Sequence, residues 1–359
     1  MQNKTFTRAI AAGIGITMAL AACGSSTAGR NANSRSTSSP TAGTSAPRTT
    51  TPLSPSLLPE PTGDLAIGVR TIPSVSPAAT TRVWYPARSG TGSGAAIYLS
   101  SKAAVAYGLT NKPLKGVLTR AYVNARPATT REARAAVVLM PGWGNPMALS
   151  TALAQDLASN GYVVVTVDPT LGTEDGSRLP ADPSNPAQRL DQIAAALKFV
   201  TGPNVAKIVG PVDPNKVAVG GHSIAGAIAF QAGLADARVH AVFDLDGWLH
   251  GPALKTPVRV PALMIDASGL DAASKAIIGR TPTAVTVKLA GATHLDVTDL
   301  PCLLPALGTF APLFRLGTIG RAGTITTDAV VVRFLDTVLR DGKPTPSAAS
   351  LTRGLTAIR

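Results

Sequence analysis

A short segment near the middle of the chain has the composition of a turn that exposes a nucleophilic serine. An apolar run is followed by two glycines, a histidine and Ser223, and small residues continue to residue 229. In a nucleophile elbow, a buried strand turns so sharply into a helix that the serine protrudes from the edge of the sheet. Side chains two positions before and after the serine would collide across this turn. Gly221 meets that demand, whereas Ala225 stands where the pattern G-x-S-x-G has its second glycine.

A serine hydroxyl becomes an effective nucleophile when a neighbouring imidazole accepts its proton, and the chain contains four histidines. The side chain of His222 should point away from the adjacent serine. His240 begins an apolar run, at the end opposite the elbow, and His250 follows that run near the mouth of the expected site. In folds with this elbow, the order along the chain is serine, acid, histidine. This order selects His294 as the general base.

The hydrophobic pattern predicts the elements that must position these residues. Continuous apolar runs suit strands that are covered on both faces, as in a parallel sheet. Two runs near the start of the globular region alternate apolar and polar residues, which predicts half-exposed antiparallel edge strands. Strands that alternate with helices indicate an α/β fold, a mostly parallel sheet with helices on both faces. The expected strands are 64–70, 81–85, 135–140, 162–167, 216–220, 240–244, 262–266 and 284–289, and the expected helices are 101–107, 149–160, 188–200, 227–234 and 329–339.

The first 60 residues predict export and attachment to a membrane. A basic start is followed by an uncharged apolar run at 9–22, which is too short to span a bilayer and is typical of a secretory signal. Residues 20–23 (Leu-Ala-Ala-Cys) resemble the bacterial lipobox, in which Cys23 becomes the acylated first residue of the mature protein; an ordinary signal peptide with an incidental cysteine is the alternative. We expect a lipoprotein signal peptide at 1–22, a disordered Ser/Thr/Pro-rich tether at 23–60 and a single domain at 61–359.

Charge and cysteine content exclude several classes of function. Residues 1–60 contain five bases and one acid, so +9 of the net charge of +13 belongs to the rest of the chain, which favours attraction to anionic lipids or envelope polymers. Nucleic-acid binding is not expected, because aromatic residues are scarce and no nucleic-acid module is recognisable. The histidines are scattered, so we expect no metal site and no cofactor. Cys302 is the only cysteine other than Cys23, so we expect no intramolecular disulfide.

Several segments, in order, resemble the platelet-activating-factor acetylhydrolase branch of the α/β-hydrolase fold, and the bacterial cutinase-like polyesterases share many of the same features. The resemblance covers roughly residues 64–339 and implies an α/β-hydrolase that cleaves esters. The segments are 82–86, 120–125, 137–144, 156–164, 212–219, 221–223, 245–248 and 291–294.

The resemblance offers two candidates for the acid that holds the histidine. Asp246 follows the strand after the elbow, where the acetylhydrolase-like enzymes carry their acid. Asp271 follows the next strand, where the polyesterases carry theirs. We favour Asp246 and retain Asp271 as the alternative; Asp244, within the strand, is a weaker candidate.

The tetrahedral intermediate requires backbone donors directed at its oxyanion. One should be the N–H of Ile224, the residue after the nucleophile, and by resemblance the other is the N–H of Trp143. The relatives often have His-Gly before this position, whereas this chain has Pro141 and Gly142. The side chains of Trp143 and Trp248 are candidates for an aromatic substrate wall, and ordinary core or rim tryptophans are the alternative.

These features predict a monomeric, cofactor-independent serine esterase, anchored by lipid on the extracytoplasmic face of the cell membrane. Expected substrates are short or medium acyl esters, including phospholipid acyl esters by resemblance. A cutinase-like hydrolase of lipids or polyesters is the enzymatic alternative. A catalytically silent envelope-binding lipoprotein with the same fold is the alternative from another class, motivated by Ala225 and Pro141.

Overall fold

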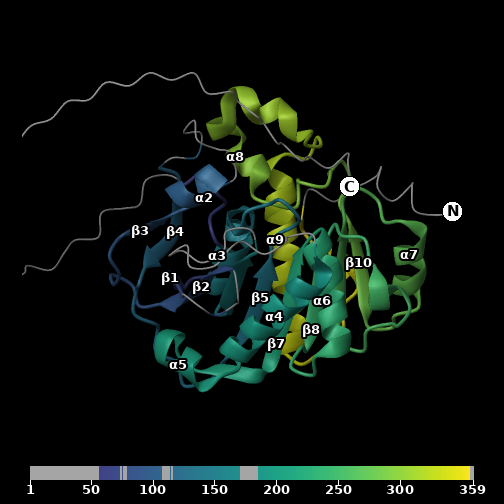
Figure 1. Cartoon of the computed structure of the whole chain (residues 1–359), viewed down its shortest axis with the longest axis horizontal. Helices are drawn as coiled ribbons and strands as arrows, with labels where there is room; N and C mark the ends of the chain where they lie inside the picture. Colours follow the sequence, from purple (N-terminus) through teal and green to yellow (C-terminus); the bar gives the residue numbers. More distant parts are fainter. Residues whose placement is uncertain are drawn as a thin grey trace, which may run out of the picture. The chain divides into compact units, whose positions relative to one another are not determined.

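The computed structural model describes residues 56–72, 75, 79–106, 114, 116–169 and 185–355 (Figure 1). The expected signal peptide, Cys23 and most of the expected tether lie outside these residues. The strands are β1 (Ala66–Thr71), β2 (Thr80–Ala87), β3 (Ala95–Ile97), β4 (Leu118–Val123), β5 (Arg134–Met140), β6 (Val163–Asp168), β7 (Val212–His222), β8 (Ala241–Leu245), β9 (Ala262–Asp266) and β10 (Ala284–Lys288). The α-helices are α2 (Ser101–Ala106), α3 (Thr151–Ser159), α4 (Pro186–Val200), α5 (Pro203–Val209), α6 (Ile224–Ala235), α7 (Ala272–Gly279), α8 (Leu300–Leu307), α9 (Arg321–Leu335) and α10 (Ala348–Thr352). Short 3-10 turns are η1 (Met147–Ser150), η2 (Gly251–Leu254) and η3 (Gly308–Phe314), and α9 continues into the π-helical turn η4 (Asp336–Arg340).

In the described part of the chain, the strands form one ten-stranded sheet with the order β10-β9-β8-β7-β5-β6-β2-β1-β4-β3 (Figure 1). The six strands from β10 to β6 in this order are all parallel to their neighbours. Strand β2 is antiparallel to both β6 and β1. The predicted α/β fold with a mostly parallel sheet is therefore confirmed, and the carboxyl ends of β5, β7 and β8 meet at one edge of the sheet.

The core explains why the parallel strands read as continuous apolar runs. Alternate residues of β5 enter two different layers: Ala136 and Val138 pack with α4 and α6, whereas Val137 and Leu139 pack with α3 and α9. All four side chains are at most 1% exposed. Because helices cover both faces of the strand, neither face tolerates a polar residue.

The N-terminal strands differ from the sequence-based expectation. Strand β2 is an interior strand between β1 and β6, and its Trp84 and Tyr85 are at most 1% exposed. The predicted antiparallel pairing of these two strands is confirmed, but their predicted position at the edge is wrong, because the sheet edges are β3 and β10. The reason is that the irregular stretch at 90–134 contributes two further strands. Of these, β4 pairs in parallel with β1, and β3 pairs with β4.

The packed unit begins before residue 61, the boundary that composition suggests. Leu58 is 1% exposed and belongs to a small apolar cluster with α2 and α8. The hydroxyl of Ser56 donates to the carbonyl of Leu118 (3.0 Å), and Arg120 forms an ion pair with Glu60. The apolar residues at the end of the tether are thus part of the fold. Over the described ranges, no helix combines the length and the apolar character needed to cross a membrane.

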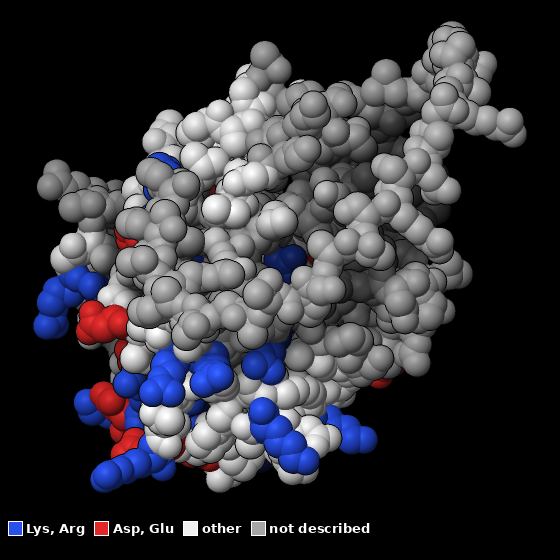
Figure 2. Space-filling model, turned by 90° about the vertical axis from the view of Figure 1, so that its left-hand side faces the viewer, with Lys and Arg blue, Asp and Glu red and all other residues white. Residues whose placement is uncertain are grey.

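Burial makes the surface more basic than the composition implies. Among the described residues, eight acidic residues are buried but only two Lys or Arg residues, Arg134 and Arg189. Figure 2 views the side of the molecule that carries β3 and β4, and blue Lys and Arg side chains predominate over acids on its lower part. The buried acids are Asp156, Asp168, Asp244, Asp246, Asp266, Asp296, Asp299 and Asp328.

Candidate active site

Ser223 occupies a strained turn between strand β7 and helix α6. Its backbone has φ 58° and ψ −129°, a conformation that residues with a side chain rarely adopt. A Cβ on Gly221 would lie 2.7 Å from Cβ of Ala225 and 2.6 Å from the carbonyl oxygen of Met140. The methyl group of Ala225 is thus accommodated because Gly221, across the turn, has none. The departure from G-x-S-x-G leaves the elbow intact.

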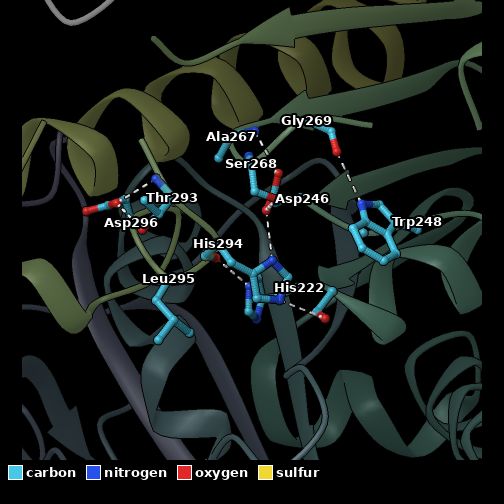
Figure 3. Close-up of polar contacts among 12 residues, drawn as sticks. His222, Asp246, Trp248, Ala267, Ser268, Gly269, Thr293, His294, Leu295 and Asp296 are labelled. Atoms are coloured by element: carbon cyan, nitrogen blue, oxygen red, sulfur yellow. Dashed lines mark hydrogen bonds and ion pairs between the residues drawn. The ribbon is translucent and has the colours of Figure 1, made fainter. Parts of the chain in front are cut away.

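The structure brings Ser223, His294 and Asp246 together at the carboxyl edge of the sheet. Nε2 of His294 lies 2.9 Å from Oγ of Ser223. Its Nδ1 lies 2.7 Å from Oδ2 of Asp246 (Figure 3). An ionised carboxylate only accepts hydrogen bonds, so Nδ1 carries the proton and Nε2 is free to accept the serine proton. This is the geometry of a Ser-His-Asp triad.

Asp246, which follows β8, is held as an anion by the turn after β9. Its Oδ1 accepts the N–H groups of Ala267 (2.7 Å) and Ser268 (2.8 Å), and its Oδ2 accepts the Ser268 hydroxyl (2.6 Å) besides His294. Burial raises the pKa of this carboxyl, but the hydrogen bonds from His294 and Ser268 outweigh it and keep the pKa below the ordinary value. The side chain is therefore charged and fixed in orientation.

The alternative acid, Asp271, caps a helix. It is the N-cap of α7, and its carboxylate accepts the N–H groups of Ala273 (2.9 Å) and Ser274 (3.0 Å) and the Ser274 hydroxyl (2.6 Å). Asp244 is fully buried with Oδ1 on the N–H of Gly247 (2.7 Å), and burial raises its pKa well above the usual value. Of the three candidates, the structure thus places Asp246 on the histidine.

Two segments present backbone amides next to the serine. Ile224 is the first residue of α6, and N–H groups in the first turn of a helix have no carbonyl partner within it. A Cβ on Gly142 would lie 3.1 Å from Cβ of Ser223, so the amide of the next residue, Trp143, belongs to the loop segment beside the nucleophile. The carbonyl of Pro141 accepts a hydrogen bond from Arg189 (2.8 Å), which anchors this loop.

The two tryptophans are on the surface. Trp143 is 44% exposed and Trp248 is 48% exposed, which excludes the alternative that they are core residues. The indole N–H of Trp248 donates to the carbonyl of Gly269 (3.3 Å; Figure 3). The side chain of His294 is itself 43% exposed, so the triad is accessible from solvent.

His222 lies inside the site, contrary to the expectation that its side chain points away. Its ring centroid is 4.5 Å from that of His294, and the ring is 2% exposed. Nε2 lies 2.8 Å from the carbonyl oxygen of His294 (Figure 3). Its Nδ1 lies 3.3 Å from the side-chain amide of Asn145. Histidine can both donate and accept hydrogen bonds, so its place directly before the nucleophile is the sequence signal for such a contact.

The remaining histidines and the cysteine lie apart from the triad. Nδ1 of His250 is 3.0 Å from the amide nitrogen of Gln231, and Nδ1 of His240 is 2.9 Å from the carbonyl oxygen of Arg238. Cys302 is a buried free thiol, and burial raises its pKa to about 11. Within the part of the chain that the structure covers, no three His, Cys, Asp or Glu residues are grouped so as to hold a metal ion.

The buried imidazole of His222 makes stability depend on pH. Burial, with the neighbouring His294, lowers the pKa of His222 from 6.5 to about 3. Between these values the unfolded chain binds a proton that the folded protein does not, so stability is lost as the pH falls below about 6.5. We expect the unfolding free energy of the wild type to fall between pH 7 and pH 5 by about 2 kcal/mol more than that of His222→Gln. One pKa unit corresponds to about 1.4 kcal/mol. Urea denaturation at both pH values measures this difference; parallel losses in the two proteins would contradict it.

Comparisons with known proteins point to ester hydrolases. A family model described as PET hydrolase-like matches residues 122–282. Cutinase 2 of Thermobifida cellulosilytica and Cutinase cut1 of Thermobifida fusca are each 29% identical over 168 residues, 44% of this chain. The matches cover 60% and 49% of those proteins, so the chain spans about half the length of the curated relatives that it matches. A solved ferulic acid esterase from Streptomyces cinnamoneus aligns with a TM-score of 0.68 and 28% identity over 83% of this chain and 96% of that one.

The sheet order, the elbow and these likenesses define the class. The protein has the α/β-hydrolase fold, with a mostly parallel sheet and an elbow at the carboxyl end of β7. Its similarity is to the cutinase and PET hydrolase-like branch of that fold.

Proposed function

We propose that the protein is a serine esterase that hydrolyses carboxylic esters through Ser223, His294 and Asp246. The observation that carries this proposal is the position of His294, whose two ring nitrogens lie within 2.9 Å of Ser223 Oγ and Asp246 Oδ2. Asp246 holds the ring proton of His294 on Nδ1, which leaves Nε2 unprotonated. Nε2 can therefore accept the proton of Ser223 and activate the serine.

The proposed reaction follows from the positions of these groups. Oγ of Ser223 attacks the ester carbonyl while Nε2 of His294 takes its proton, and the amides of Ile224 and Trp143 stabilise the oxyanion. When the carbon–oxygen bond to the alcohol breaks, His294 returns the proton to the leaving alcohol. Water then attacks the acyl-serine, again losing a proton to His294, which passes to Ser223 as the carboxylic acid leaves. Asp246 remains ionised and stabilises the imidazolium in both steps.

The open site favours esters with a bulky apolar part. Trp143 and Trp248, each nearly half exposed, offer aromatic surface to the acyl or alcohol group of a substrate. We propose short or medium acyl esters and phospholipid acyl esters as substrates, in line with the acetylhydrolase-like resemblance. The cutinases and the ferulic acid esterase among the similar proteins support an alternative, a polyesterase-like activity on cutin-type or aromatic esters.

We further propose that the enzyme is a monomer anchored by acylated Cys23 on the extracytoplasmic face of the membrane. The support is the lipobox-like sequence before Cys23 and the Ser/Thr/Pro-rich stretch that follows it. The basic surface fits an anionic envelope.

Covalent labelling separates the esterase from a catalytically silent binding protein. A fluorophosphonate reacts with an activated serine, and we expect one equivalent to attach to the peptide containing Ser223, with hydrolysis of p-nitrophenyl butyrate lost in proportion. Ser223→Ala serves as the control and should stay unlabelled. A protein that binds lipid esters but neither reacts at Ser223 nor hydrolyses them would reject the proposed function.

A further inference from the structure

His222 contacts two loops whose relative position matters for the proposed reaction. The residue ends strand β7, one position before the nucleophile, and its buried ring lies against that of His294 at an interplanar angle of 42°. From there it reaches the main chain of His294 and the side chain of Asn145, in the loop that also carries Trp143. One side chain thus links the elbow, the histidine loop and the oxyanion loop.

The two contacts determine the tautomer of the ring. A carbonyl oxygen only accepts, so Nε2 of His222 carries the proton that is donated to the carbonyl of His294. Nδ1 is then an acceptor for the amide of Asn145. Burial and the adjacent His294 lower the pKa of His222 to about 3, which keeps the ring neutral and this pattern intact at neutral pH.

The oxyanion loop packs directly on this imidazole. A Cβ on Gly142 would lie 2.7 Å from Nδ1 of His222 and 3.2 Å from the amide nitrogen of Asn145. The glycine therefore permits a close approach that a larger residue would prevent, and the amide of Trp143 follows directly in the chain. The position of the ring limits the position of this amide.

The histidine loop is held from its other side by Asp296. The Oδ2 atom of Asp296 accepts the N–H group and the hydroxyl of Thr293, each at 2.7 Å (Figure 3). It also accepts the N–H group of Gly317 at 2.7 Å. These bonds fix the residue before His294. The contact from His222 fixes the carbonyl of His294 itself.

We propose that His222 is a positioning residue for acyl transfer, whose neutral imidazole ties the main chain of His294 to the oxyanion loop. This inference rests on the proposed esterase function. His222 takes no proton from the substrate or the serine, because its Nε2 already carries a proton and its Nδ1 accepts from the side-chain amide of Asn145. It acts by keeping Nε2 of His294 and the amide of Trp143 aligned with Ser223.

Three substitutions at this position separate the contacts. The amide nitrogen of glutamine reaches the place of Nε2 and can donate to the carbonyl of His294. Asparagine reaches only the place of Nδ1 and retains the contact to Asn145. Leucine fills the space without either hydrogen bond. His240→Leu is the matched control, because His240 is bonded to the carbonyl of Arg238 and lies at the other end of the sheet.

We expect kcat for p-nitrophenyl butyrate, normalised to active sites titrated with a fluorophosphonate, to fall about 10²-fold in His222→Leu and His222→Asn. In His222→Gln it should stay within about tenfold of wild type, because the hydrogen bond to the carbonyl of His294, the contact that positions the general base, is retained. KM should change little in all three, and His240→Leu should match wild type. Equal kcat in the three variants, or losses that appear in KM, would show a merely space-filling role and overturn the proposal.

A structural measurement tests the positioning without relying on hydrolysis. In a crystal structure of His222→Leu, we expect the distance from His294 Nε2 to Ser223 Oγ to exceed the 2.9 Å of the wild type. An unchanged distance and an unchanged oxyanion loop overturn the proposal even in an active enzyme. If instead the geometry shifts while the wild type lacks Ser223-dependent hydrolysis, the esterase proposal fails and takes the role in acyl transfer with it, although His222 is still shown to hold the two loops in place. Asn145→Ala gives a second variant of the same link, should His222→Leu not fold.

Discussion

Replacing Ser223 by alanine is expected to lower kcat for p-nitrophenyl esters by about 10⁴- to 10⁶-fold. The variant retains the backbone donors and both tryptophans but has no oxygen to form the acyl-enzyme, so only the slow direct attack of water remains. KM should stay close to that of the wild type, since substrate binding does not depend on Oγ. Steady-state hydrolysis of p-nitrophenyl butyrate measures both constants.

Ser223→Gly separates the chemistry from the strain at the elbow. Both variants lack the nucleophile and should be equally inactive, but the conformation at φ 58° costs alanine about 1 kcal/mol or more and glycine almost nothing. Ser223→Gly should therefore be the more stable of the two by about 1 kcal/mol in urea denaturation. Measurable turnover in either variant would show that another group is the nucleophile.

Much of the fold is predictable from the sequence because the parallel strands are covered on both faces. The apolar run at 135–140 becomes β5 and the run at 262–266 becomes β9, since burial on both sides leaves a continuous signal. The region at 90–134 gave no such signal. Its strands β3 and β4 are short and form the end of the sheet, only three of their nine side chains are buried, and β4 pairs with β1, which is distant in sequence.

The candidate site also has a part that the sequence predicts and a part that it does not. The elbow is a local feature, so Gly221 and Ser223 identify it, and chain order points to His294. The position of His222 is not local: it depends on where the loops carrying Asn145 and His294 come to lie. The choice between the acids had a local signal, because an aspartate such as Asp271, directly before an alanine-rich run that forms a helix, is a typical N-cap residue.

Replacing Asp246 by asparagine is expected to lower kcat by about 10⁴-fold, because it forces the wrong tautomer on His294. The Oδ1 site accepts two backbone N–H groups, from Ala267 and Ser268, and must remain an oxygen. The new NH₂ group then occupies the Oδ2 site, opposite Nδ1 of His294. Two donors cannot face each other, so Nδ1 loses its proton to Nε2, which can no longer accept the proton of Ser223.

Asp271→Asn is the matched control for this substitution. Asparagine caps helices as well as aspartate does, so α7 should remain capped and kcat should stay within about threefold of the wild type. Initial rates on p-nitrophenyl butyrate, with thermal denaturation to establish that both variants fold, measure the contrast. The opposite pattern, an active Asp246→Asn and an inactive Asp271→Asn, would identify Asp271, after β9, as the acid. His294 would then have to turn away from Asp246 during the reaction.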